Sequence, residues 1–126
     1  MTRFHAAPEE KPLFWVGRSK EDLSGFPEAV QDDIGWALSA VQFGGKHPRA
    51  KPWKGEGPGI FEIISDFRGD TYRAVYTVRF AKAIYVLHAF QKKSATGRKT
   101  ARSDVDLIRQ RLRIAQQDYE VRYGQE

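Results

Sequence analysis

Apolar and polar residues follow a two-residue period in the middle of the chain and a three-to-four-residue period on either side of it. Stretches 60–67, 72–80 and 84–91 are rich in β-branched and aromatic residues and are bounded by turn residues, which predicts three strands. A short apolar run over 12–17, ended by a glycine, predicts a further strand near the start. The sheet is therefore expected to form mainly from the middle of the chain.

Helical spacing predicts two long helices. The first follows a helical turn that begins at Ser19, has Pro27 in its first turn and ends at Gly44. Its apolar stripe consists of Phe26, Val30, Ile34, Ala37, Leu38 and Val41. The final helix has a packing face made of Val105, Ile108, Leu112, Ala115 and Tyr119.

The order of these elements predicts an α+β fold. Residues 68–70 and 81–83 are short enough to join the three consecutive strands as hairpins, so the sheet is expected to be small and antiparallel. Residues 45–59 are rich in proline and glycine and are predicted to form a loop. Both helices are expected to pack on one face of the sheet.

A chain of 126 residues predicts a single domain. Residues 1–11 are polar and are expected to be a flexible N-terminal tail, and residues 12–126 the domain. There is no cysteine, the three histidines are scattered, and no apolar run is long enough to span a bilayer. A cytoplasmic protein without a metal site, a cofactor or a membrane association is therefore expected.

Positive charge is concentrated in the predicted sheet and its loops. Residues 44–103 contain 13 Lys and Arg against 4 Asp and Glu, a net charge of +9 within a chain of net charge +5. Such a distribution favours a polyanionic partner such as RNA. A basic surface without a specific ligand is the alternative interpretation.

Strand alternation places two charged residues on one face of the sheet. Tyr72, Ala74 and Tyr76 share the natural core face of their strand, which leaves Arg73 on the open face. On the preceding strand, Glu62 lies on this open face as well. A cross-strand ion pair is the favoured interpretation; the alternative is that Arg73 orients Glu62 as a general base for a substrate hydroxyl.

Lysines near this face supply further positive charge. Lys92 and Lys93 end the last strand, so one of them is expected to point to the same pocket as Arg73, and Lys54 lies in the glycine-rich loop. Its neighbour Trp53 is expected to be a packing residue, or alternatively to stack on a base. His88 is interpreted as a buried histidine with its hydrogen bonds satisfied.

Four motifs follow one another in an order that resembles a known superfamily. They are Lys-Pro-Trp-Lys-Gly at 51–55, Gly-Ile-Phe-Glu at 59–62, Tyr-Arg-Ala-Val-Tyr at 72–76 and Val-Leu-His-Ala-Phe-Gln-Lys-Lys at 86–93. Together with the final helix, they resemble the RelE/HigB superfamily of toxins from type II toxin–antitoxin systems, in particular its phage-derived HigB-like branch.

The resemblance implies a RelE-like fold, related to the sandwich of microbial ribonucleases. It also implies an endoribonuclease that cleaves mRNA at the ribosome without a metal, through attack of the ribose 2′-hydroxyl, and that is neutralised by a HigA-like helix-turn-helix antitoxin. The implied catalytic residues are Arg73 and Lys93 or Lys92, to which Glu62 is added as a candidate base. RNA binding is expected from Lys51, Trp53, Lys54, Arg68, Arg98 and Lys99.

The chain departs from the pattern of better-known relatives at several positions. Glu62 and Ile64 stand where RelE proteins have lysines, Thr100-Ala101 stands where this branch often has Thr-Pro, and no tyrosine follows Lys93 until Tyr119. Two other functions therefore stay open: a non-enzymatic gyrase inhibitor like the ParE toxins, and an inactive member that only binds its antitoxin. Arg73 with Lys92 and Lys93 favours RNA cleavage over the gyrase inhibitor, because ParE-like proteins generally lack this basic set.

Overall fold

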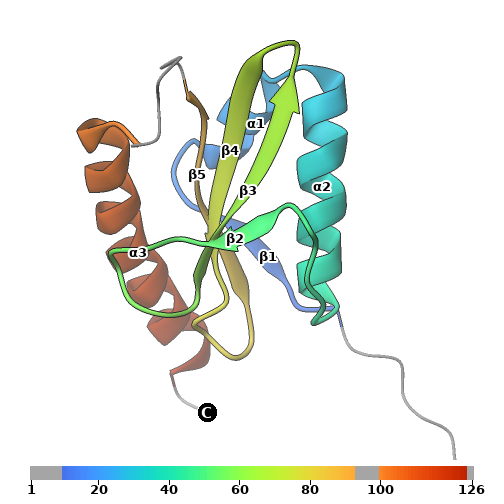
Figure 1. Ribbon diagram of the computed structural model, residues 1–126. Coiled ribbons are helices and arrows are strands. Elements are labelled where there is room, and N and C mark those ends of the chain that lie inside the picture. Colours follow the sequence, from blue (N-terminus) through green and yellow to red (C-terminus); the bar gives the residue numbers. More distant parts are fainter. Residues whose placement is uncertain (1–9, 93–99, 125–126) are drawn as a thin grey trace, which may run out of the picture.

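The computed structural model describes residues 10–92 and 100–124, and it has three helices and five strands in this part of the chain. Figure 1 shows the sheet between two helices, α2 on one side and α3 on the other. The elements follow in the order β1 (Leu13–Trp15), α1 (Ser19–Ser24), α2 (Glu28–Gln42), β2 (Ala50–Pro52), β3 (Ile60–Phe67), β4 (Asp70–Thr77), β5 (Ile84–Lys92) and α3 (Arg102–Tyr123).

The five strands form one mixed sheet in the order β1-β5-β4-β3-β2. Strands β2 to β5 are antiparallel, whereas β1 runs parallel to β5, with Leu13 opposite Ile84. The α+β class and the two hairpins are confirmed, but the prediction of a purely antiparallel sheet was wrong. The parallel pair joins strands about 70 residues apart, and no local turn signal encodes a pairing of that kind.

Both faces of the sheet are covered. On one face, the α2 face, α2 packs on Ile63, Ala74 and Val86; on the opposite face, the α3 face, α3 packs on Val75 and Leu87. The expectation that both helices share one face was therefore wrong. The first seven residues of β5 are all buried and, apart from His88, apolar or aromatic, which is the pattern of a strand buried on both sides.

Strand β2 lies within residues 45–59, which were predicted to form a loop because they are rich in proline and glycine. It pairs with β3 at the edge of the sheet, where Pro52 lies opposite Phe61. Edge strands accept proline because one side of the strand has no ladder hydrogen bonds to lose. This short strand brings the segment after α2 back to the sheet, next to Glu62.

A β-bulge interrupts the pairing of β4 with β5. Val75 lies opposite His88 and Tyr76 opposite Val86, so Leu87 has no opposing residue. The extra residue allows both Leu87 and His88 to contact α3. The bulge therefore brings a histidine to the α3 face directly beneath the final helix.

The described part of the chain begins with an anchored segment. The Lys11 N–H donates to the Gln42 carbonyl (2.8 Å), and the Gln42 side-chain amide donates to the Lys11 carbonyl (2.9 Å). Lys11 is thus fixed, while the rest of the predicted tail, residues 1–9, lies outside the described residues. Within residues 10–92 and 100–124, no helix has the length and apolar composition needed to cross a membrane.

Candidate functional site

Arg73 and Glu62 lie side by side on the α3 face and form an ion pair. An Arg73 Nη donates to Glu62 Oε1, and the two side chains are only 15% and 14% exposed. The prediction that they share a face and pair across the hairpin is confirmed. The face is not open, however, because α3 covers much of it, and removing Arg73 is therefore expected to affect stability as well as function.

Lys92 adds a second cation to this pair. It lies opposite Thr71 in the β4–β5 register, on the same face as Arg73. Lys92 Nζ and Arg73 Nε are buried and have no hydrogen-bond partner among the residues that the structure describes. Burial lowers the pKa of Lys92, the charge of Arg73 lowers it further, and Glu62 partly opposes both. Two cations thus share one carboxylate in a poorly solvated position.

A shallow depression of about 440 Å³ opens above the ion pair. The strands contribute Glu62 and Arg73 to its lining, and the glycine-rich loop contributes Lys54. The start of α3 lies at its edge, and the N-cap residue of this helix, Ala101, offers no side-chain cap. Free N–H groups at a helix N-terminus attract anions. The complete lining is Pro52, Trp53, Lys54, Glu62, Arg73, Thr100 and Val105.

The glycine-rich loop beside the depression is held in place at two points. Glu56 accepts a hydrogen bond from Arg109 of α3 (2.6 Å), and Arg79 donates to the carbonyl of Pro58 (3.2 and 3.1 Å). Gly55 and Gly57 have φ values of 111° and 88°, which side chains with a Cβ rarely adopt. No local pattern indicates the Glu56–Arg109 pair, because 53 residues separate its members.

Trp53 is a core residue, only 8% exposed, in the apolar cluster beneath α3. The packing interpretation is confirmed, and the ring has little free surface on which a base can stack. Lys54, its neighbour, is exposed at the depression. The loop therefore offers an apolar anchor and a solvated cation at adjacent positions.

His88 is buried and its hydrogen bonds are satisfied, as predicted. Its Nε2 lies 2.7 Å from Asp104 Oδ1, its Nδ1 lies 3.4 Å from Arg111 Nη1, and its ring stacks on Phe90. An arginine can only donate, so Nδ1 is the acceptor and Nε2–H donates to Asp104. This pair fixes the first turn of α3 to the sheet. Asp104 was not singled out from the sequence.

Two other predicted RNA-binding residues, Lys51 and Arg68, do not line the depression. Lys51 lies opposite Glu62 on the edge strand and is exposed, but it does not line the depression. Arg68 sits in the β3–β4 turn with its guanidinium 5.1 Å from the centre of the Phe67 ring, a residue of the α2 face. The three remaining basic residues of the prediction, Lys93, Arg98 and Lys99, lie outside the described residues.

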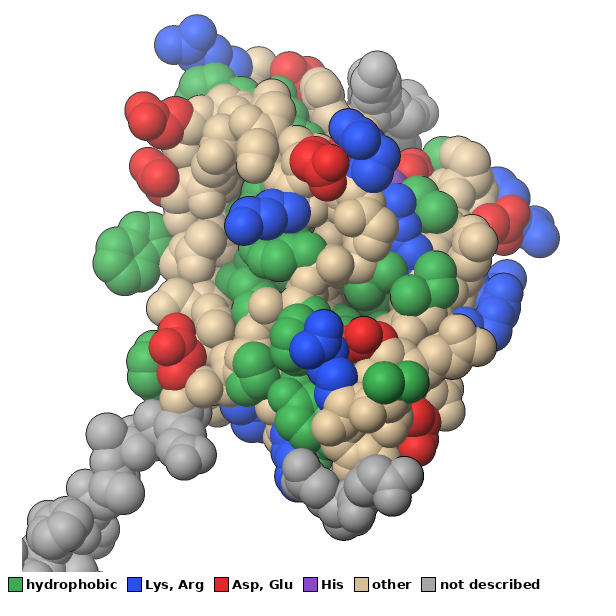
Figure 2. Space-filling view, turned by 180° about the vertical axis from the view of Figure 1, so that it is seen from behind, with side chains coloured by type: hydrophobic (Ala, Val, Ile, Leu, Met, Phe, Trp, Pro, Cys, Tyr) green, Lys and Arg blue, Asp and Glu red, His purple; other side chains and the backbone are tan. Residues whose placement is uncertain are grey.

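The surface charge is mixed on the side that Figure 2 shows. Lys and Arg side chains are interspersed there with Asp and Glu, and they form no patch of one sign. Among residues 10–92 and 100–124, no three His, Asp or Glu side chains come together in a group that could hold a metal ion. The charged side chains of Arg73, Glu62 and Lys92 come together on the α3 face.

A comparison with protein families gives a match over most of the chain. The model of a family described as phage-derived protein Gp49-like (DUF891) matches residues 21–113, which include α2, all of β2 to β5 and the first half of α3. No curated protein and no solved structure matches the chain.

Proposed function

The chain belongs to the family of phage-derived Gp49-like proteins, and we propose that it is a HigB-like toxin of a type II toxin–antitoxin system that cleaves mRNA. The family is associated with RelE-like toxins of such systems. The α+β fold, with helices packed on a five-stranded sheet, agrees with a small RelE-like protein. The family match supports a toxin-like protein. The proposal that this protein cleaves RNA is argued from the charged residues at the depression.

One observation supports this proposal: Arg73, which lines the depression, and Lys92, which lies next to it on the α3 face but outside the lining, have only the Glu62 carboxylate between them. Arg73 and Lys92 share a single carboxylate, and each keeps a buried nitrogen without a hydrogen-bond partner among the described residues. A buried donor without a partner costs about 1–3 kcal/mol, and more when it is charged. A phosphodiester oxygen at this position supplies the missing charge and the missing acceptor. The cluster is thus suited to hold the phosphate at which a chain is cut.

The same residues can support strand cleavage by transesterification. The ribose 2′-hydroxyl oxygen attacks the adjacent phosphorus and its proton passes to Glu62, whose Oε2 is left for substrate when Oε1 pairs with Arg73. The P–O5′ bond breaks, and the leaving 5′-oxygen takes a proton from Lys92. The products are a 2′,3′-cyclic phosphate and a 5′-hydroxyl end.

Each residue has a physical reason for its part. The Arg73 guanidinium orients Glu62 through their hydrogen bond and stabilises the negative charge that develops on the phosphate oxygens. The lowered pKa of Lys92, caused by its burial and then by Arg73, makes its ammonium a stronger acid than a solvated lysine. No step in this scheme requires a metal ion.

Expression in cells tests the proposal as a whole. The protein should arrest growth, a helix-turn-helix protein encoded next to it should restore growth, and mapped RNA 5′ ends should fall within translated regions, as expected for cleavage at the ribosome. A folded protein that arrests growth with intact transcripts would favour the gyrase-type alternative. A folded protein that leaves growth unchanged would favour an inactive member that only binds its antitoxin.

A further inference from the structure

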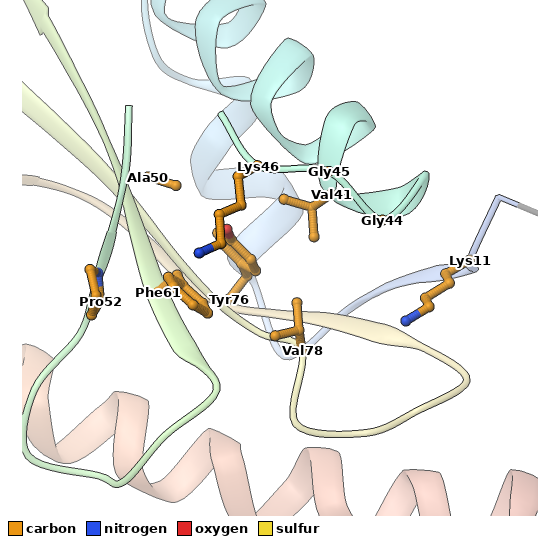
Figure 3. Close-up of a pocket in the computed structure, with 10 residues that line it drawn as sticks. All are labelled: Lys11, Val41, Gly44, Gly45, Lys46, Ala50, Pro52, Phe61, Tyr76 and Val78. Atoms are coloured by element: carbon orange, nitrogen blue, oxygen red, sulfur yellow. The ribbon is translucent and has the colours of Figure 1, made fainter. Parts of the chain in front are cut away.

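A second concave site lies on the α2 face, and Pro52 of the edge strand is the one residue that its lining shares with the depression. It has a volume of about 350 Å³, at the small end of the range for ligand pockets. Figure 3 shows residues from the end of α2, from the sheet and from the segment before β1 around it. Its lining is Lys11, Val41, Gly44, Gly45, Lys46, Ala50, Pro52, Phe61, Tyr76 and Val78. We call it the α2 pocket.

The interior of the α2 pocket is apolar. The rings of Phe61 and Tyr76 stack on each other with their centres 5.8 Å apart, and Val41 and Val78 stand close to them in Figure 3. Pro52 and Ala50 bound it on the side of the edge strand. This interior is suited to one bulky apolar side chain, which would lose its contact with water on entering.

The polar side chains of the α2 pocket are all donors at neutral pH. Lys46 and Lys11 enter from different sides, and neither has a carboxylate partner among the described residues. Burial raises the pKa of Tyr76 to about 12, so its hydroxyl keeps its proton. Lys11 is held by its backbone bonds to Gln42, which fixes the rim. The charge of the rim therefore selects for an anionic group.

The neighbouring edge of the sheet, strand β2, is not suited to pairing with another strand. Pro52 has no N–H, and the Ala50 N–H already donates to the His47 carbonyl (2.9 Å). Addition of a strand relies on main-chain hydrogen bonds along a free edge, so this edge is blunted. Beside it, the α2 C-cap residue Phe43 is 48% exposed. A partner at this place would insert side chains rather than extend the sheet.

We propose that the α2 pocket receives a segment of a partner protein that presents one bulky apolar side chain next to an Asp or Glu. The apolar interior takes the side chain, and Lys11 and Lys46 pair with the carboxylate. Apolar anchors in such pockets carry most of the energy of many protein interfaces, with charges at the rim setting specificity. The α2 pocket and the charged residues Arg73, Glu62 and Lys92 are on opposite faces of the sheet. The proposed interaction therefore does not depend on RNA cleavage.

The test is an NMR titration of the ¹⁵N-labelled full chain with three short peptides: acetyl-Glu-Phe-Leu-Asp-amide, its relative with lysine at both ends, and acetyl-Glu-Ser-Ser-Asp-amide. The first peptide should shift the amides of Val41, Gly44, Phe61 and Val78 in a saturable way, with a Kd of about 1 mM or tighter. The other two should not. The double variant Lys11→Glu/Lys46→Glu should weaken binding about tenfold or more.

The matched control is Lys20→Glu/Arg113→Glu, which makes the same change in net charge at two exposed positions outside the pocket. It should bind like the parent chain. Equal binding of the lysine peptide, or a normal Kd with the charge-reversed rim, would overturn the proposal. Tighter binding of free 3-phenylpropionate than of the peptide would identify a small-molecule pocket instead, and shifts that depend on protein concentration alone would identify a second copy of the chain as the occupant.

Discussion

The two faces of the sheet bury very different chemistry. Between α2 and the sheet, the fully buried side chains are almost all apolar, and the main polar contact is Ser65 donating to Asp33. Between α3 and the sheet lie the Arg73–Glu62 pair, the Lys92 amine and the His88–Asp104 pair. The same strands build both layers, so the difference comes from the residues that alternate along them.

This contrast separates stability from function. An apolar layer gains free energy from burial, whereas buried charges have to be compensated by partners and contribute little net stability. Both faces bury an apolar cluster and are expected to contribute free energy of folding through it, but the α3 face also buries the charges of Arg73, Glu62 and Lys92. The α3 face keeps a costly arrangement, with two donors that lack partners among the described residues, and such arrangements are typical of functional sites.

The largest expected effect comes from breaking the ion pair on the α3 face. Arg73→Gln leaves the Glu62 carboxylate buried without its main partner, which should cost about 3–5 kcal/mol of unfolding free energy, measured by urea denaturation. RNA cleavage should fall about 10²–10³-fold, because one electrostatic contact to the transition state is lost. The double variant Arg73→Gln/Glu62→Gln should recover stability but not cleavage. Recovery of cleavage in the double variant would contradict the role given to Arg73.

Two identical substitutions compare the faces directly. Ile34 and Ile108 are both fully buried, the first in α2 and the second in α3. Each change to alanine should cost about 2–5 kcal/mol in urea unfolding. Only Ile108→Ala should also weaken RNA binding, because α3 carries Val105 and Arg109 beside the depression. Equal losses of RNA affinity at temperatures where both variants are folded would remove the distinction between the faces.

A smaller effect is expected at the far end of α3. The Tyr85 hydroxyl donates to Asp118 (2.6 Å), and burial, followed by this bond, raises its pKa. Tyr85→Phe should cost about 1.5–3 kcal/mol, the value of a hydrogen bond to a charged group. Burial favours the neutral form of Asp118, but bonds from Tyr85 and Arg122 outweigh it and lower the pKa. The loss of unfolding free energy caused by Tyr85→Phe should therefore be full at neutral pH. It should become smaller in acid, as the pH falls through the lowered pKa of Asp118.

The smallest expected effect is an increase in the free energy of unfolding. Folding lowers the pKa of Lys92 from 10.5, so the charged lysine reduces the free energy of unfolding at neutral pH. This loss of stability disappears once the pH exceeds the pKa that Lys92 has in the unfolded chain. Lys92→Met should therefore stabilise the fold by roughly 1 kcal/mol at pH 7 and by less as the pH rises toward 10.5. RNA cleavage should fall at the same time. A variant that is less stable at pH 7 would show that Lys92 has a structural partner.

Local patterns predicted the parts of the fold that depend on local chemistry. The bounds of β3 were predicted as observed, alternation put Glu62 and Arg73 on one face, and helical spacing found Ile108 and Leu112 as buried residues of α3. These features follow from the two-residue and 3.6-residue periods alone. The sequence therefore located the charged pair before any contact was known.

The features that were not predicted from the sequence depend on contacts between residues far apart in the chain. Nothing near Leu13 indicates a parallel partner some 70 residues later, and the helical pattern of α3 does not reveal which sheet face it covers. The prediction of an open face failed for that reason. The Glu56–Arg109 contact and the missing partners of Lys92 arise only when the loop, the helix and the sheet come together.

The central claim is that the buried cations of the α3 face hold a phosphodiester for cleavage. End-group analysis of an mRNA incubated with the purified protein and translating ribosomes, and in parallel with the protein alone under EDTA, tests it most directly. We expect 2′,3′-cyclic phosphate and 5′-hydroxyl ends with the parent chain, and intact RNA with Arg73→Gln at a temperature where this variant is folded. Intact RNA with the folded parent chain in both reactions, or 5′-phosphate ends, would contradict the claim.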